Sequence, residues 1–418
     1  MSETISSGSS SSSVPSSSGS NIIYGSIPVL PTQNIDGGFR FDFNSGIRVS
    51  FPEDGKYHLR FWNADTNVLI YDSDVNPNSI ITGNRKYLVR WRFEISRAED
   101  RSVVVDYTMD LKGRNVVVQM PVNTLGDSIG WFSYLERFQK KFGCVLHVVS
   151  SVAIRGLFER QYPNFKFIGK DEVQSVEDLY ACYYLGLFFS GSREYQPVDF
   201  RISGLHRQAG MILGLRTKEE LEDIPPRVSV GKKRPMKEKY VTIATKSSAQ
   251  CKLWNHPYGW DKVIAFLKSN GYKVVCIDKE RTYGKDYVFH QIPWGVEDWT
   301  GAKPLQERVD EIAHSEFFIG LSSGLSWLAW CCGVPVVMIS GFSLPQTEFY
   351  TPYRIINYDS PCVGCWDDIK ETFDHTDYFW CPRHKDEQSR RYECSKLITP
   401  DQVISVIRKI PTFKSSIG

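Results

Sequence analysis

The stretch Phe317–Val337 reads FFIGLSSGLSWLAWCCGVPVV and decides the fold class of the chain. An apolar run is followed by a turn at Ser322-Ser-Gly324, a helical segment and a second apolar run that begins at Pro335. Strand, helix and strand in this order form parallel sheets in α/β proteins. The turn places serines and a glycine at a helix N-terminus, where backbone N–H groups and the helix dipole suit a phosphate or diphosphate. A simple capped turn fits the same residues equally well.

Similar strand–helix units extend in both directions from this stretch. The second half of the chain predicts strands over 240–245, 273–277, 317–320 and 335–339, and helices over 260–270 and 305–314 and from residue 324. Its last helix begins with Thr399-Pro-Asp-Gln402, a capping box with proline at the first helical position. The first half predicts strands over 116–120, 144–149, 165–168 and 179–188, with helices over 129–142 and 205–213. A charged, proline-containing linker over 216–238 separates two Rossmann-like domains that face a cleft.

The N-terminal part has a different pattern. Residues 1–21 are rich in serine, and we expect them to form a disordered tail. Apolar and polar residues then alternate, as in Tyr57–Phe61 and Val89–Ile95, and turn signals separate these runs. This alternation predicts a β-rich domain over 22–112, before the Rossmann-like domains over 113–238 and 239–412.

Bulk composition excludes several classes of function. The chain has 418 residues, 41% of them hydrophobic, and 50 Lys and Arg against 48 Asp and Glu give a net charge of +2. This balance indicates neither nucleic-acid binding nor a polybasic membrane surface. No apolar run approaches the roughly 20 residues of a spanning helix. No apolar stretch precedes Ile22, so we expect no secretory signal and a cytoplasmic location.

Four cysteines gather in one segment that has almost no apolar periodicity, residues 361–397; they are Cys362, Cys365, Cys381 and Cys394. The first two form a CxxC pair, and four thiolates around one ion would stabilise a segment that cannot build its own core. His375 and His384 lie in the same stretch and are possible replacement ligands. Zinc is the default from ligand type, and four thiolates suit iron equally. Unpaired thiols and disulfides are the alternatives.

Two neighbouring stretches form a pattern of their own: the D-x-T-G sequence Asp298-Trp-Thr-Gly301 and the turn Ser322-Ser-Gly-Leu-Ser-Trp327. Together they resemble the ADP-heptose heptosyltransferases of lipopolysaccharide synthesis. The family turn usually reads D-T-G-L-S-H, so this chain replaces its Asp and its His. The resemblance implies a backbone cradle for the donor diphosphate, formed by Ser322, Ser323, Gly324 and Leu325. It also implies an adenine site, for which the candidates are Trp299, Thr300, Gly301 and Pro304.

Two further motifs match the same family. The stretch Ala244–Trp254 ends in K-x-W, similar to the family's K-x-W-P, which implies that Lys252 neutralises the leaving diphosphate. Thr245 would lie near the same oxygens, and Lys246 is a second candidate. The helix start Leu125-Gly-Asp-Ser128 matches a G-D motif whose Asp is the general base, so the resemblance assigns that role to Asp127. A helix N-cap is the alternative for Asp127, and a solvated surface charge is the alternative for each lysine.

The stretches LGDSIGW, YYLGLFF, QCKLWNHPYGW and GLSSGLSWLAW, with the β-rich extension and the cysteines, narrow the resemblance to the bacterial autotransporter heptosyltransferases over residues 22–412. This implies a GT-B-type fold with the acceptor on the 113–238 side and ADP-heptose on the 239–412 side. The implied reaction is inverting transfer of heptose from ADP-heptose to Ser or Thr hydroxyls of an autotransporter adhesin. One iron ion (Fe3+) per subunit in a metal finger over 361–397, no metal at the diphosphate and a dodecamer are also implied.

Two other functions fit the same sequence. A lipopolysaccharide-type heptosyltransferase would act on a sugar, although the β-rich extension and the cysteines argue against it. A non-catalytic sugar-nucleotide-binding scaffold is favoured by the replaced residues Ser322 and Trp327. We expect the cysteine segment to be a finger-like insertion that supports subunit contacts or acceptor docking, apart from the donor chemistry.

Overall fold

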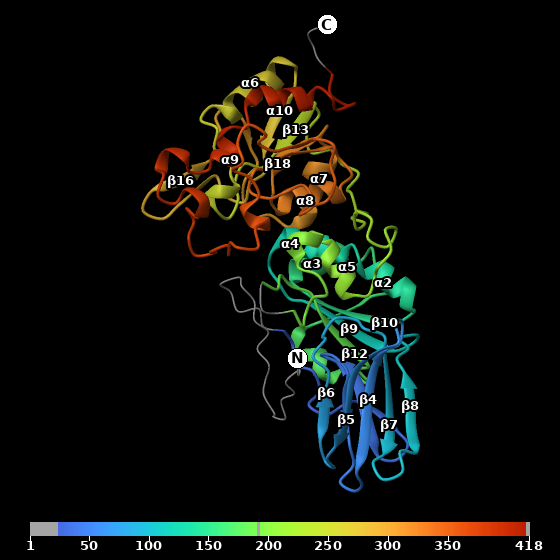
Figure 1. The fold of residues 1–418 in the computed structure, drawn as a ribbon. Helices are drawn as coiled ribbons and strands as arrows, with labels where there is room; N and C mark the ends of the chain where they lie inside the picture. Colours follow the sequence, from blue (N-terminus) through green and yellow to red (C-terminus); the bar gives the residue numbers. More distant parts are fainter. Residues whose placement is uncertain (1–23, 190–192, 415–418) are drawn as a thin grey trace.

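The computed structural model describes residues 24–189 and 193–414, so the predicted tail over 1–21 lies outside the described residues. The described chain forms three tiers (Figure 1). A β-rich tier at the N-terminal end is followed by one α/β half and then by a second α/β half that carries the C-terminus. Within the described ranges, no helix is both long enough and apolar enough to cross a membrane.

The β-rich tier contains a four-stranded antiparallel sheet in the order β5-β4-β7-β8. Its strands are β4 (Tyr57–Asn63), β5 (Val68–Val75), β7 (Trp91–Arg97) and β8 (Val103–Thr108). Leu59 and Phe61 of β4 are buried, whereas His58 and Arg60 lie partly in solvent. The alternation in the sequence therefore marks the inner face of this sheet.

The first α/β half is built on a sheet that continues into the β-rich tier. Its order is β11-β10-β9-β12-β2-β3-β6, with β1 paired to β2. The strands are β1 (Gln33–Ile35), β2 (Phe39–Asn44), β3 (Arg48–Ser50), β6 (Ile80–Thr82), β9 (Asn115–Met120), β10 (Val145–Ser150), β11 (Lys166–Ile168) and β12 (Ala181–Tyr184). Strands β9 to β12 are parallel, and β12 also pairs in parallel with β2, with Ala181 opposite Phe43. Hydrogen bonds therefore cross the boundary predicted at residue 112.

The helices of this half are α1 (Leu125–Phe132), α2 (Leu135–Phe142), α3 (Val152–Phe158), α4 (Phe200–Ser203) and α5 (Arg207–Ile212). The sequence predicts one helical stretch where α1 and α2 lie. The Ser133 hydroxyl donates to the Gly130 carbonyl at 2.8 Å, and the Arg137 guanidinium donates to the Ser133 carbonyl at 3.0 Å. Side chains thus replace backbone bonds of a continuous helix, and this gives a physical reason for the interruption.

The second α/β half has a fully parallel sheet in the order β17-β14-β13-β18-β19-β20. Its strands are β13 (Tyr240–Ile243), β14 (Lys273–Cys276), β17 (Glu297–Asp298), β18 (Phe318–Leu321), β19 (Val336–Ile339) and β20 (Arg354–Ile355), and a hairpin of β15 (Thr282–Gly284) and β16 (Val288–Gln291) stands apart. The helices are α6 (Gly259–Ser269), α7 (Leu305–Ala313), α8 (Gly324–Cys331), α9 (Glu393–Lys396) and α10 (Pro400–Ile407). The predicted strand–turn–helix–strand over 317–337 is confirmed as β18, α8 and β19.

The two halves meet where the N-termini of α1 and α8 touch. A Cβ added to Gly324 would lie 2.8 Å from Leu125 Cβ and 3.2 Å from the Gly126 nitrogen, so only glycine permits this approach. Trp327 of α8 fills the remaining space and is 3% exposed. The linker over 216–238 contains no helix or strand and connects the halves along one side. This contact fixes the cleft in which the predicted site lies.

Candidate active site

A cavity of about 800 Å³ lies between the two α/β halves. From the first half, the loop after β9 and the start of α1 line it. From the second half, segments that follow β13, β14, β18 and β19 line it. The carboxyl ends of the parallel strands in both sheets therefore face the cavity, which is where open α/β sheets bind ligands.

Asp127 lies on the first-half wall of this cavity, in the first turn of α1. The N-cap of the helix is Thr124, so the alternative in which Asp127 is the N-cap residue is wrong. The Thr124 hydroxyl donates to Asp127 Oδ2 at 2.6 Å. Burial raises the pKa of Asp127, whereas this hydrogen bond and the charge of Lys252 act in the opposite direction. A carboxylate with a raised pKa is a stronger base, which suits proton abstraction from a hydroxyl.

Lys252 lies on the opposite wall, at the end of a 3-10 turn over Gln250–Lys252. Burial lowers the pKa of Lys252, and the charges of Asp127 and Glu348 act against this shift. Aromatic rings surround its ammonium group. The predicted base and the predicted cation thus face one cavity from opposite halves and interact electrostatically.

The serine turn supplies a third part of the wall, with Ser322, Ser323, Gly324 and Leu325 all at the cavity. The first N–H groups of α8 lack partners within the helix and point toward its N-terminal end, at the cavity. Ser323 is the N-cap and makes no side-chain cap bond. The turn therefore lies at the cavity, and its role as a backbone cradle for a diphosphate stays a prediction.

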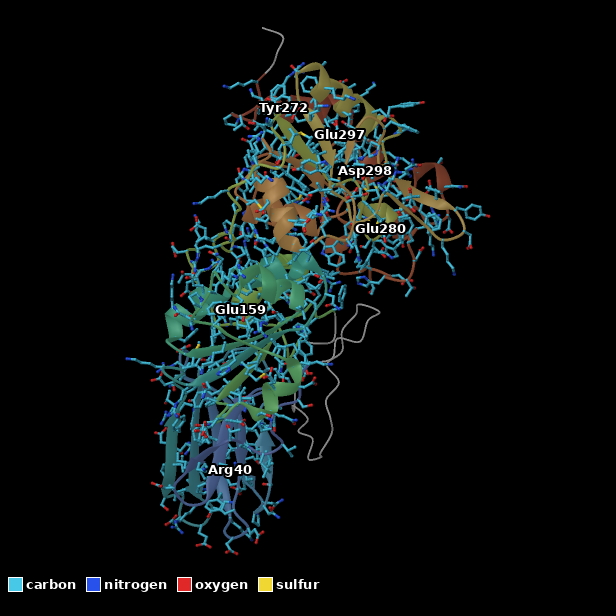
Figure 2. All side chains as sticks on the ribbon, turned by 180° about the vertical axis from the view of Figure 1, so that it is seen from behind. Arg40, Glu159, Tyr272, Glu280, Glu297 and Asp298 are labelled. Carbon is cyan, nitrogen blue, oxygen red and sulfur yellow. The ribbon has the colours of Figure 1, made fainter. Side chains whose placement is uncertain are left out.

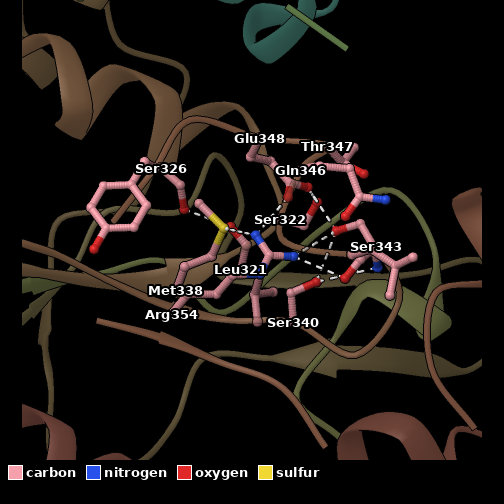
Figure 3. Close-up of polar contacts among 12 residues, drawn as sticks. Leu321, Ser322, Ser326, Met338, Ser340, Ser343, Gln346, Thr347, Glu348 and Arg354 are labelled. Carbon is pink, nitrogen blue, oxygen red and sulfur yellow. Dashed lines mark hydrogen bonds and ion pairs between the residues drawn. The ribbon is translucent and has the colours of Figure 1, made fainter. Parts of the chain in front are cut away.

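The Ser322 hydroxyl is held by a buried carboxylate that the sequence did not single out. It donates to Glu348 Oε1, which also accepts from the Ser343 hydroxyl at 2.7 Å. Glu348 Oε2 accepts from Arg354 Nη1 at 2.6 Å (Figure 3). Glu348 also lines the cavity, so a carboxylate stands beside the turn although Ser322 itself carries none. No sequence motif marks it, because it lies in a loop 26 residues after Ser322.

Thr245 and Lys246 lie beside the cavity with partners of their own. Thr245 is 1% exposed and is not among the residues that line the cavity; its hydroxyl donates to Asp278 Oδ2 at 2.8 Å. Lys246 lines the cavity, and its Nζ pairs with Glu280. Asp278 also lines the cavity and accepts from the backbone nitrogens of Thr245 and Lys246. Thr245 thus orders the loop through Asp278, and Lys246 lies at the cavity wall.

The predicted adenine segment lies behind Asp278 instead of in the cavity wall. Trp299, Thr300, Gly301 and Pro304 are absent from the lining of the described cavity. The Gly301 nitrogen donates to the Asp278 carbonyl at 3.2 Å, and the Arg308 guanidinium binds the carbonyls of Trp299 and Gly301 at 2.8 Å. Figure 2 shows Asp298 and Glu280 in this second half. The segment follows β17 at the edge of the sheet and stays a prediction as an adenine contact.

The four cysteines are all buried in the segment over 361–397. The Cys394 thiol donates to Cys362 and lowers the pKa of that thiol to about 6, with a further contribution from His384. Across the described residues, no three His, Cys, Asp or Glu side chains stand in a metal-binding arrangement. The four thiols are shielded from solvent, as the ligands of a four-thiolate site would be.

This segment also reaches the cavity. Trp366 and His375 line its wall. None of the four cysteines is among the residues that line the cavity, so other residues of the segment, and not the cysteines themselves, reach it. The physical reason is that 3-10 turns at Cys365–Asp367 and Pro382–His384 fold the segment back onto Phe342, next to Lys252.

Family models and known proteins match this chain over most of its length. Residues 36–99 match the model of the N-terminal domain of glycosyltransferase TibC, and residues 211–358 match glycosyltransferase family 9 (heptosyltransferase). The autotransporter heptosyltransferase BAHTCr of Citrobacter rodentium is 47% identical, over 92% of this chain and 91% of its own length. Autotransporter heptosyltransferase TibC of Escherichia coli O78:H11 is 48% identical, over 92% of each chain. The inactive autotransporter heptosyltransferase BimC of Burkholderia thailandensis is 35% identical, over 91% of this chain and 88% of its own length.

The solved structures give the same relation. A crystal structure of TibC, an iron-containing dodecameric glycosyltransferase, matches with a TM-score of 0.86 and 46% identity, over 92% of this chain and 98% of that chain. A second structure of the same protein contains ADP-D-beta-D-heptose and matches equally well.

Proposed function

Because the chain belongs to the autotransporter heptosyltransferases, within glycosyltransferase family 9, we propose that it transfers heptose from ADP-heptose to hydroxyl groups of an autotransporter adhesin. The observation that carries this proposal is the placement of Asp127 and Lys252 on opposite walls of one cavity. TibC binds ADP-D-beta-D-heptose, which supports the same donor here. The acceptor hydroxyl belongs to serine or threonine, since only these side chains offer an aliphatic alcohol.

The proposed reaction is a single displacement. The Asp127 carboxylate takes the proton of the acceptor hydroxyl, whose oxygen forms a bond to the anomeric carbon. The bond from that carbon to the diphosphate oxygen breaks on the opposite face, so the configuration inverts. ADP leaves with the electron pair, and the Lys252 ammonium and the N–H groups at Ser323–Leu325 stabilise its growing negative charge. The proton remains on Asp127 until solvent removes it.

We further propose that the four cysteines hold one iron ion per subunit and that the chain assembles as a dodecamer. TibC is iron-containing and dodecameric, and all four thiols of this chain are buried in one segment. Four thiolates leave no open ligand position, so the bound metal would stabilise the segment and supply no group to the transfer. Zinc is the alternative for the same ligand set.

The proposal is tested by incubating the purified chain with ADP-heptose and an adhesin fragment that contains serine and threonine. Intact-mass and peptide analysis should show addition of heptosyl units to hydroxyl side chains. The Asp127→Asn variant, which keeps size and loses the base, should bind ADP and transfer no heptose. Transfer only to a core sugar would instead identify a lipopolysaccharide-type enzyme.

The scaffold alternative has one specific observation in its favour, namely that BimC, an inactive relative, shares 35% identity. ADP binding by the unmodified chain without any transfer would establish this alternative. Against it stands the retained pair of Asp127 and Lys252, both at the cavity, because a binding scaffold has no need of a general base.

A further inference from the structure

The environment of the Lys252 ammonium is unusual for a lysine at an anion site. Over the described ranges 24–189 and 193–414, its Nζ makes no hydrogen bond and no ion pair. It lies instead 4.9–5.3 Å from the centroids of three aromatic rings, called the aromatic cage from here on: Phe342, Trp366 and Phe373. A cation within about 6 Å of a ring face is attracted by the ring quadrupole.

The aromatic cage is a packed unit. Its three ring centroids lie 5.5 Å from one another in every pair, and each side chain is at most 7% exposed. Phe342 follows β19, whereas Trp366 and Phe373 belong to the cysteine segment. Phe342 and Trp366 line the cavity, and Phe373 closes the cage from behind without reaching the cavity. The aromatic cage thus packs the cysteine segment against Phe342 and Lys252 in the rest of the second α/β half.

The nearby carboxylates do not replace the cage as a partner. Both oxygens of Glu348 are engaged by Arg354, Ser343 and Ser322, and Asp127 Oδ2 accepts from Thr124. Both carboxylates influence Lys252 only through longer-range charge. The ammonium is therefore held in place by groups that carry no net charge.

We propose that the aromatic cage is a positioning device that fixes the Lys252 ammonium at the cavity wall while leaving its positive charge unneutralised. A carboxylate in the same place would cancel much of the field that the lysine exerts on a diphosphate. Aromatic rings attract the cation and add no opposing charge, so the full charge stays available to the leaving group. This inference rests on the proposed transfer from ADP-heptose and adds positioning residues to it.

The test uses Phe373, because this ring contacts the lysine and does not contact the cavity. The full chain and its Phe373→Leu and Phe373→Tyr variants are assayed for kcat and KM with ADP-heptose and an adhesin fragment. ADP affinity is measured separately by calorimetry. The matched control is Phe379→Leu, an aromatic residue of the same segment that is 41% exposed and packs on Tyr378. Metal content and oligomer size are compared across all variants.

We expect Phe373→Leu to lower kcat/KM by about tenfold, the rate equivalent of one partly buried cation–π contact. Phe373→Tyr, which keeps the ring face, and Phe379→Leu should stay near the parent value. In a Lys252→Met background, Phe373→Leu should have no further effect. Equal rates for Phe373→Leu and Phe379→Leu, or an additive loss in the Lys252→Met background, would overturn the proposal. Phe373→Met replaces Phe373→Leu if the latter fails to fold.

The outcomes separate this inference from the proposed function. A parent chain that binds ADP and transfers no heptose would remove the proposed function. The cage would then be judged on ADP affinity alone, which Phe373→Leu should weaken and Phe373→Tyr should preserve. Unchanged ADP affinity in Phe373→Leu under that condition would remove the cage as well.

Discussion

Replacing Glu348 by glutamine should destabilise the second α/β half, because Glu348 is half of a buried ion pair. The Glu348 and Arg354 side chains are 3% and 7% exposed and lie 2.6 Å apart. Glu348→Gln keeps the size of the side chain and removes its charge, so the Arg354 guanidinium stays buried without a carboxylate. Removing one partner of a buried pair costs about 3–5 kcal/mol of unfolding free energy.

The expected change in the unfolding midpoint Tm depends on the size of the unit that contains the ion pair, which is the second α/β half over 239–414. Each kcal/mol shifts the midpoint of a 150–250-residue domain by roughly 2–4 °C, so the expected fall in Tm is about 6–20 °C. Thermal unfolding is followed by circular dichroism at one protomer concentration, because oligomer stability depends on concentration.

The matched control is the double variant Glu348→Gln with Arg354→Met. It removes both charges, so it should recover more than half of the lost Tm, as expected when neither ion is left unpaired. A Tm for Glu348→Gln within about 2 °C of the parent, far below the range expected from the buried pair, would refute the reasoning. A double variant no more stable than Glu348→Gln alone would refute it too, since the loss would then not come from an unpaired guanidinium.

Three further predictions concern the cavity. Thr124→Ala should move the acidic limb of the kcat/KM–pH profile to higher pH, because the Thr124 hydroxyl stabilises the ionised form of Asp127 and its loss raises the pKa further; an unmoved limb would contradict this. Gly324→Ala should raise KM for ADP-heptose and lower unfolding free energy by about 1–3 kcal/mol, because the new Cβ meets Leu125; thermal unfolding and steady-state kinetics check this. Cys362→Ser should lower metal content and ADP affinity together, because other residues of the cysteine segment line the cavity; elemental analysis and calorimetry measure the two. Loss of metal with unchanged ADP affinity would show that the cysteine segment does not shape the ADP site.

Local sequence patterns predicted the helices, strands and turns that depend on interactions between residues close in the sequence. The stretch over 317–337 gave a strand, a turn and a helix in the right order, and the capping box at Thr399 is formed, with Gln402 Oε1 accepting from the Thr399 nitrogen at 2.8 Å. The pairing of β2 with β12 was missed, because it joins residues about 140 positions apart and leaves no periodic signal. The interruption at Ser133 was missed because it depends on side-chain bonds in the folded state.

The site residues also fall into those that local sequence predicts and those that it does not. Asp127, Lys252 and the turn at Ser322 follow strands at short, recognisable spacing, and all three reach the cavity as predicted. Glu348 and Trp366 reach it from loops that carry no motif, so only the folded chain reveals them. Sequence motifs identify residues that closely follow a strand and therefore lie at the cavity. They do not identify residues of later loops that fold back to the cavity.

The replaced turn residues are best understood together with their new neighbours. Ser322 lacks the carboxylate that the resembled family has at this position, but its hydroxyl binds Glu348, whose carboxylate lies at the same wall. Trp327 takes the place of the family's histidine and packs where an added Cβ on Gly126 would lie only 2.8 Å from its ring. Each replacement is therefore matched by a partner of complementary chemistry or size. Loss of the original residues without such accommodation would leave empty space at these two positions, so the close packing favours a turn that was rebuilt around its replacements.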